Sequence, residues 1–151
     1  MRAAAACLGR RVGLRGAALL LAGIGWTTYG IGIITDPRYV VQRGVSVLTR
    51  LWPLDWWGAV WIVCGLLALA AAVLRPGRDA WGFGAVVLPP LVWAGAYIVA
   101  WLTGRYPAAW TSTPAWCVPS GLLIIVAALS ANLTTARRRI RVLEKRRCGG
   151  E

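Results

Sequence analysis

The acidic residues are the first candidates for chemistry, because the chain has no histidine to act as a general base. There are five of them: Asp36, Asp55, Asp79, Glu144 and Glu151. No two have a spacing that would place them together in a pocket, and each has an adjacent arginine or a solvated loop to explain it. We therefore interpret them as residues of membrane boundaries and of a tail, not as an acid–base pair.

Other reactive side chains are equally dispersed. Ser120 follows Pro119 with no base in view, and the sequence has no glycine-rich phosphate loop. The cysteines form no C-x-x-C pair, so the usual zinc and haem sites have no ligand set. They stand at Cys7, Cys64, Cys117 and Cys148. The sequence predicts no catalytic residue, no metal site and no cofactor, and an enzyme is not expected.

Four long apolar stretches dominate the chain and must position everything else. They cover residues 16–35, 56–74, 80–102 and 115–136 and contain no Asp, Glu, Lys or Arg. About 20 helical residues at 1.5 Å rise cross a hydrocarbon core of roughly 30 Å, so each stretch can span a bilayer once. We predict an all-α membrane protein with a single four-helix transmembrane domain over residues 1–151.

The basic residues are sorted by side of the membrane. Thirteen of the 17 Lys and Arg residues precede the first span, lie between the second and third, or follow the fourth. The positive-inside rule then places both termini in the cytoplasm (N-in/C-in). The expected location is the cytoplasmic (inner) cell membrane, with residues 137–151 as a basic cytoplasmic tail.

Tryptophans mark the opposite boundary. Indole rings prefer the headgroup level, where the ring is buried and the N–H is hydrated. The residues expected at this outer interface include Trp52, Trp56, Trp57 and Trp61. Interfacial anchoring is the simpler interpretation of this group. The alternative is that segment 52–57 binds a lipid headgroup or a partner.

The third span contains Pro89 and Pro90 at its middle, which removes two backbone donors and clashes with the preceding turn. A kink is expected there. It is either a hinge that serves function or a bend tolerated by packing, and the bend alone is favoured.

Two segments outside the spans also have helical patterns. In the first outer loop, Val41, Val45, Leu48 and Trp52 recur at steps of three to four residues, which predicts a helix lying in the interface. In the tail we expect the last span to continue as a helix whose arginines bind anionic lipid. These residues are Arg137, Arg138, Arg139 and Arg141. The basic residues of the tail are already explained by their role in fixing the orientation of the spans, so nucleic-acid binding is not expected.

Ion-coupled transport usually needs an ionisable group within the bilayer, and none of the four apolar stretches has one. Small four-span multidrug exporters rely on a membrane-embedded glutamate, so its absence counts against that resemblance. Small residues at four-residue spacing would allow close helix approach. The pairs are Ala18 and Ala22, Ala68 and Ala72, Ala96 and Ala100, and Ala127 and Ala131.

Composition indicates an origin. Sixteen Arg against one Lys, together with 24 Ala, is the bias of GC-rich coding. With this layout of spans, loops and tail, the chain resembles the uncharacterised small four-span membrane proteins of high-GC actinobacteria and their phages. The resemblance covers nearly the whole length, rests on layout, and carries no functional residues across.

Two functional hypotheses follow. In the first, the protein is holin-like: a phage-type membrane protein that forms homo-oligomers and permeabilises the lipid bilayer. In the second, it is a structural or accessory subunit that acts through a larger, unknown membrane partner. A neighbouring endolysin gene would favour the first hypothesis.

Overall fold

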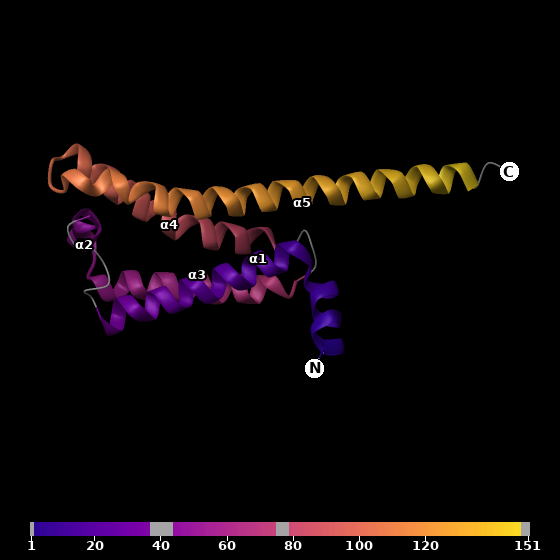
Figure 1. The fold of residues 1–151 in the computed structure, drawn as a ribbon, viewed down its shortest axis with the longest axis horizontal. Coiled ribbons are helices and arrows are strands. Elements are labelled where there is room, and N and C mark those ends of the chain that lie inside the picture. Colours follow the sequence, from indigo (N-terminus) through magenta and orange to yellow (C-terminus); the bar gives the residue numbers. More distant parts are fainter. Residues whose placement is uncertain (1, 37–43, 75–78, 149–151) are drawn as a thin grey trace.

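The computed structural model describes the backbone of residues 2–36, 44–74 and 79–148, and the side chains of residues 13–36, 44–74 and 79–133. Every regular element in these ranges is a helix (Figure 1). In chain order they are α1 (Arg2–Thr35), α2 (Ser46–Leu51), α3 (Leu54–Ala72), α4 (Ala80–Leu102), the 3-10 helix η2 (Pro107–Thr111) and α5 (Thr113–Cys148).

The predicted fold class is confirmed. Within the described residues, four helical segments are long and apolar enough to cross a membrane. They are Gly13–Thr35, Leu54–Ala72, Ala80–Leu102 and Pro107–Leu133. The protein is therefore a multi-pass integral membrane protein, in contact with the lipid bilayer along these helices.

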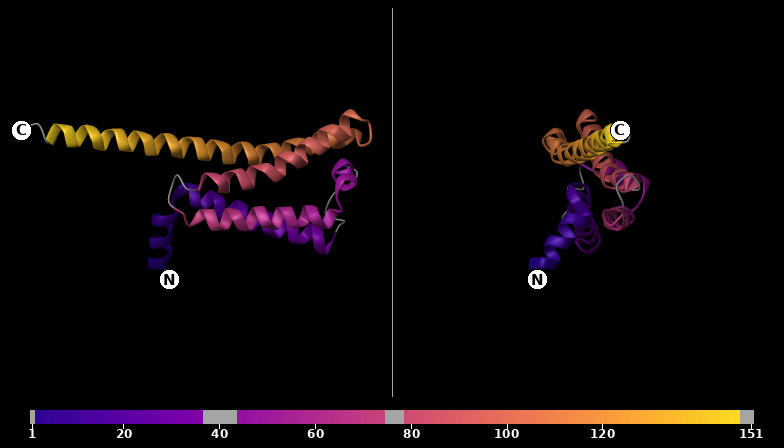
Figure 2. Two further views of the ribbon diagram at one scale, coloured as in Figure 1. Left: turned by 180° about the vertical axis from the view of Figure 1, so that it is seen from behind. Right: turned by 90° about the vertical axis from the view of Figure 1, so that its right-hand side faces the viewer.

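The spans form two antiparallel pairs, α1 with α3 and α4 with α5 (Figures 1 and 2). Helices α2 and η2 lie together at one end of the bundle, which we call the loop end. Both chain termini leave from the opposite, terminal end, as four spans require. Which of the two ends faces the cytoplasm stays a prediction from the charge distribution.

Glycines set the closest helix contact, between α1 and α3. A Cβ atom on Gly23 would lie 2.8 Å from the carbonyl oxygen of Gly65, and one on Gly30 would lie 2.6 Å from that of Gly58. Real Cβ atoms do not come this close, so the two backbones meet only because both sides lack a side chain. In each helix the two glycines are seven residues apart, which is about two turns.

The alanine pairs noted in the sequence behave unequally. In α3 and α4 the pairs are buried, at Ala68, Ala72, Ala96 and Ala100. In α1 and α5 they are only half-buried or exposed, at Ala18, Ala22, Ala127 and Ala131. Small-residue spacing identified part of the packing surface, whereas the glycine repeat between α1 and α3 was not anticipated.

The core divides along the bundle axis. The loop-end half is rich in aromatic rings and includes Trp61, Trp93 and Tyr97. The terminal-end half is built from smaller residues around Leu19, Phe83 and Val86. Aromatic rings therefore fill much of the loop-end half, whereas mostly aliphatic and small side chains fill the terminal-end half.

The predicted loop helix is present as α2, a short helix of six residues. Two of the residues on its expected apolar face, Val45 and Leu48, are buried in the loop-end core. Gly44 lies against the ring of Tyr97, with space for no side chain. The helix thus packs on the bundle through this face, whereas Val41 lies outside the described residues.

Helix α1 is broken once, at Gly13. Its φ of 59° and ψ of −178° are non-helical and belong to a region that side chains rarely adopt. The residues before the break turn away from the axis of the span (Figure 1).

Candidate functional site

A buried ion pair joins the first and third spans at the terminal end. The Nε atom of Arg15 lies 2.6 Å from Oδ2 of Asp79, and its Nη2 atom donates to Oδ1 at 3.0 Å. The side chains are only 15% and 4% exposed, respectively. This forked geometry matches the planar guanidinium to both carboxylate oxygens and fixes the orientation of each partner.

The same guanidinium also binds the fourth span. Nη1 of Arg15 donates to the carbonyl of Ala127 at 3.0 Å and to Oγ of Ser130 at 3.1 Å. Its Cζ atom lies 4.8 Å from the ring centroid of Phe83, which adds a cation–π contact. One side chain on α1 therefore holds the start of α4 and the middle of α5, and we call this group the Arg15 clamp.

The Arg15 clamp corrects two sequence expectations. Asp79 was explained by its neighbouring arginine in the chain, but it is buried and paired with Arg15, 64 residues away. The four apolar stretches were expected to contain no ionisable group, yet the guanidinium of Arg15, which precedes the first stretch by one residue, binds Ala127 and Ser130 of the fourth. The signal was available: two opposite charges stand at the starts of spans that enter from the same side.

A second polar contact lies at the paired prolines. Helix α4 runs through Pro89 and Pro90, and both prolines are buried. Because proline has no N–H, the carbonyl of Val86 cannot receive its usual bond from residue 90. The indole Nε1 of Trp26 on α1 donates to this oxygen at 2.8 Å. The donor that the proline lacks is thus supplied by another helix.

This contact bears on the expected kink. A carbonyl freed by proline can line a cavity or be satisfied by a neighbour. At Val86 it is satisfied within the bundle, which supports the structural interpretation of Pro90. The kink itself and its use as a hinge stay predictions.

An aromatic cluster fills the loop-end half of the bundle around Trp61. The ring of Trp61 has its centroid 4.8 Å from that of Tyr29, 5.1 Å from Trp26, 5.5 Å from Trp93 and 5.6 Å from Trp116. Edge-to-face pairs of this kind contribute about 0.5–1.5 kcal/mol each beyond area burial. The Nε1 atom of Trp61 has no hydrogen-bond partner among the described residues, so ring packing is what holds it.

The four tryptophans expected at the outer interface divide between two environments. Trp52 and Trp56 are 57% and 67% exposed, and their anchoring in the headgroup region stays a prediction. Trp57 is half-buried and donates to the carbonyl of Leu48 at 3.1 Å. Trp61 is fully buried, so its ring packs against other helices and not against lipid headgroups, and its depth at the outer interface stays a prediction.

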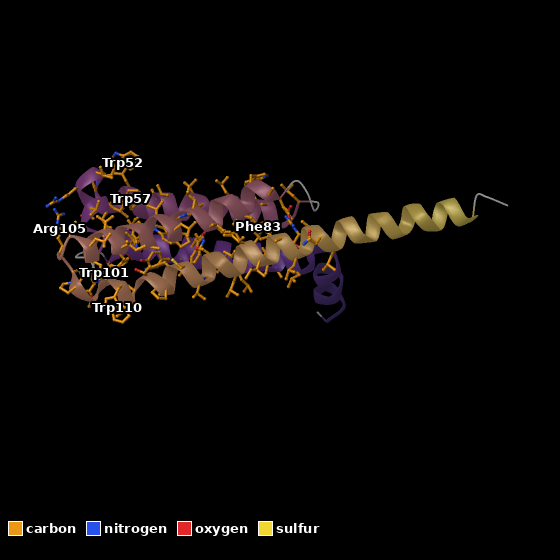
Figure 3. The ribbon with its side chains drawn as sticks, turned by 90° about the horizontal axis from the view of Figure 1, so that it is seen from above. Trp52, Trp57, Phe83, Trp101, Arg105 and Trp110 are labelled. Atoms are coloured by element: carbon orange, nitrogen blue, oxygen red, sulfur yellow. The ribbon has the colours of Figure 1, made fainter. Side chains whose placement is uncertain are left out.

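Exposed aromatic and basic side chains gather at the loop end. Figure 3 shows Trp52, Trp101, Arg105 and Trp110 there, while Phe83 lies toward the other end. These tryptophans come from three different parts of the chain, between 48% and 59% exposed. An indole belt around one end of a bundle is the arrangement that membrane interfaces favour.

A small apolar pocket lies between α3 and α4. It has a volume of about 70 Å³ and is lined by Trp57, Val60, Trp61, Leu88, Pro89, Val92 and Trp93. Such a lining has no group that could ligate a metal or move a proton. Elsewhere in the described residues no three His, Cys, Asp or Glu side chains come together as metal ligands.

The bundle leaves the outer face of α5 open. Only 6% of the apolar segment Pro107–Leu133, which contains the first part of α5, is buried, compared with 50% of Ala80–Leu102. Four exposed residues follow one another at steps of four, three and four residues, which places them on one face. They are Val118, Leu122, Ile125 and Leu129. We call them the α5 face.

The predicted lipid-binding arginines Arg137, Arg138, Arg139 and Arg141 belong to the continuation of α5, as the sequence suggested. Their side chains lie outside the described ones, and lipid binding stays a prediction.

Comparison with protein-family models, curated proteins and solved structures finds no match. The fold and its sites thus define a four-span integral membrane protein, held together by the Arg15 clamp, the glycine contact and the aromatic cluster.

Proposed function

We propose that the protein is a non-enzymatic membrane protein that acts by lateral association of its helices in the bilayer. The α5 face carries this proposal. Its four large apolar side chains are each more than half exposed, and the bundle covers only one side of α5. Within a membrane, helices associate by close side-chain packing and interhelical hydrogen bonds, and an unshared face is where a further helix can pack.

The first form of this proposal is holin-like. Copies of the chain would associate through the α5 face and permeabilise the bilayer once their density is high enough. No substrate site is needed for such an activity. The charge of Arg15 is matched by Asp79 inside the bundle, so this pair serves assembly of the spans and not an ion-binding cycle.

Induced expression with a membrane-potential dye tests the holin-like form. We expect an abrupt loss of potential after a lag, because a lesion that depends on helix density forms only above a threshold. A co-expressed endolysin should be released at the same time. If membrane-inserted protein at high level leaves potential and viability intact and retains the endolysin, the holin-like form is wrong.

The second form is an accessory subunit whose α5 face packs on a larger membrane partner. Cross-linking at Cys117 distinguishes the two forms of the proposal. Cys117 is exposed on α5, one residue before Val118 of the α5 face. In a variant that keeps only Cys117, oxidation in membranes should join two copies if the chain self-associates. A control variant carrying Ser120→Cys in place of Cys117 should not cross-link, because position 120 is buried. Failure of Cys117 to cross-link favours the accessory form.

A further inference from the structure

The segment before Gly13, residues 2–12, is a helix that turns away from the span, and we call it the N-terminal arm. It projects sideways from the terminal end of the bundle, whereas the rest of α1 runs along the bundle (Figures 1 and 2). The turn is built into the backbone, because Gly13 has a φ of 59°. Two residues later Arg15 is fixed to α4 and α5, so the arm leaves the bundle from an anchored point.

The arm starts at the membrane boundary. The apolar stretch of the first span begins at residue 16, three residues after Gly13, and Leu14 between them is 68% exposed. A helix that departs sideways from this level stays near the lipid headgroups along its length. The sideways direction of the arm therefore keeps it at the depth of the lipid headgroups.

The C-terminal tail has the opposite geometry. Helix α5 extends to Cys148, 12 residues beyond the end of the apolar stretch at residue 136, and it keeps the direction of the span (Figure 1). At about 1.5 Å per residue this places the last turn roughly 20 Å from the membrane boundary. The first tail residues stay close to the headgroups, and the last ones do not.

The sequence of the arm suits a lipid surface. It contains Arg2, Arg10 and Arg11 together with alanines and Leu8, and it has no acidic residue. Helices that combine cations with apolar residues lie in the interface, where anionic headgroups attract each cation. We propose that the N-terminal arm lies in the headgroup layer at the terminal end and binds anionic phospholipids. This proposal does not depend on the proposed function.

The natural cysteines provide the test, because Cys7 is in the arm and Cys148 is at the end of the tail. Each is kept as the single cysteine of a full-length variant and labelled with a fluorophore whose emission shifts to the blue outside water. The proteins are reconstituted in vesicles of phosphatidylcholine, with or without phosphatidylglycerol. We expect the Cys7 label to shift to the blue with phosphatidylglycerol, and the Cys148 label to emit as in water in both.

Neutralising the arginines gives the matched comparison. Arg10→Gln with Arg11→Gln should reduce the shift of the Cys7 label in phosphatidylglycerol vesicles, whereas Arg146→Gln with Arg147→Gln should leave it unchanged. A Cys7 label that emits as in water with phosphatidylglycerol overturns the proposal. A blue shift that is equal in both vesicles and insensitive to the arm variants also overturns it, because the arm would then be covered by the protein or held by apolar partition.

Discussion

The indole Nε1 of Trp26 donates its hydrogen bond, at 2.8 Å, to the carbonyl of Val86, four residues before Pro90. An intrahelical bond from residue 90 would ordinarily end on this oxygen. Two features that look unrelated in the sequence, a tryptophan inside the first span and a proline pair inside the third, are therefore one structural unit. The bond also ties α1 to the middle of α4, where glycine contacts are absent.

Replacing Trp26 with Phe should destabilise the bundle. Phenylalanine keeps a ring near Trp61 but leaves the Val86 carbonyl without its donor, at a cost of about 1–3 kcal/mol. Unfolding in detergent measures the change. Trp81→Phe is the control, since Trp81 is 45% exposed and should tolerate the substitution. In a Pro90→Ala background the backbone donor returns, so the cost of Trp26→Phe should shrink. An equal cost in both backgrounds contradicts the compensation.

Asp79→Asn should destabilise the protein strongly, because it leaves the charge of Arg15 uncompensated between helices. Breaking a buried ion pair typically costs about 3–5 kcal/mol. Detergent unfolding is again the measurement, and Asp55→Asn is the control because Asp55 is exposed. The double variant Arg15→Gln with Asp79→Asn should lose less than the sum of the single losses. Simple additivity would mean that the two residues do not act as a pair.

Four glycines of α1 should respond to alanine in opposite ways. Gly23→Ala and Gly30→Ala push a methyl group into the α3 backbone and should lower stability. Gly25→Ala and Gly32→Ala meet nothing within 4 Å, so they should leave stability unchanged or raise it by up to about 1 kcal/mol. The measurement is detergent unfolding of all four variants. Equal behaviour of the two groups would contradict the glycine contact between α1 and α3.

Reporter fusions should decide the orientation. Thirteen of 17 basic residues belong to the side of the termini, which predicts that both termini are cytoplasmic. Alkaline phosphatase fused after Glu151 should be inactive, and a fluorescent protein at the same place should be bright. Active phosphatase with a dark fluorescent protein would reverse the topology.

The spans could be predicted because a bilayer imposes length and apolarity on any helix that crosses it. The third span was expected at 80–102, and α4 covers Ala80–Leu102. The pairing of Arg15 with Asp79 had one signal in the sequence, the opposite charges at the starts of two spans that enter from the same side. The local pattern around two residues 64 positions apart does not report that their spans are neighbours. The holin-like function has no local signal of this kind either, and it stays a proposal.

The environment of each tryptophan depends on how its helix is rotated. Trp56 and Trp61 were both expected at the outer interface, but one is 67% exposed and the other is fully buried. The rotation of α3 is set by its glycine contacts at Gly58 and Gly65. Trp61 follows Gly58 by three residues and precedes Gly65 by four, so all three share one face of the helix. Hydropathy locates the boundary, whereas this spacing indicates which rings face protein.

The Arg15 clamp imposes an order on biosynthesis. When a ribosome has completed α3, the first pair of spans has its glycine contact, but Arg15 has no carboxylate to bind. Asp79 emerges only with α4, and Ser130 emerges only when most of α5 has been made. A nascent chain must therefore keep an unmatched cation at the membrane boundary until Asp79 emerges, and the full clamp forms only when translation of the second pair is nearly complete. A product truncated after α3 would keep that unmatched charge, which gives membrane quality control a means of recognising the incomplete chain.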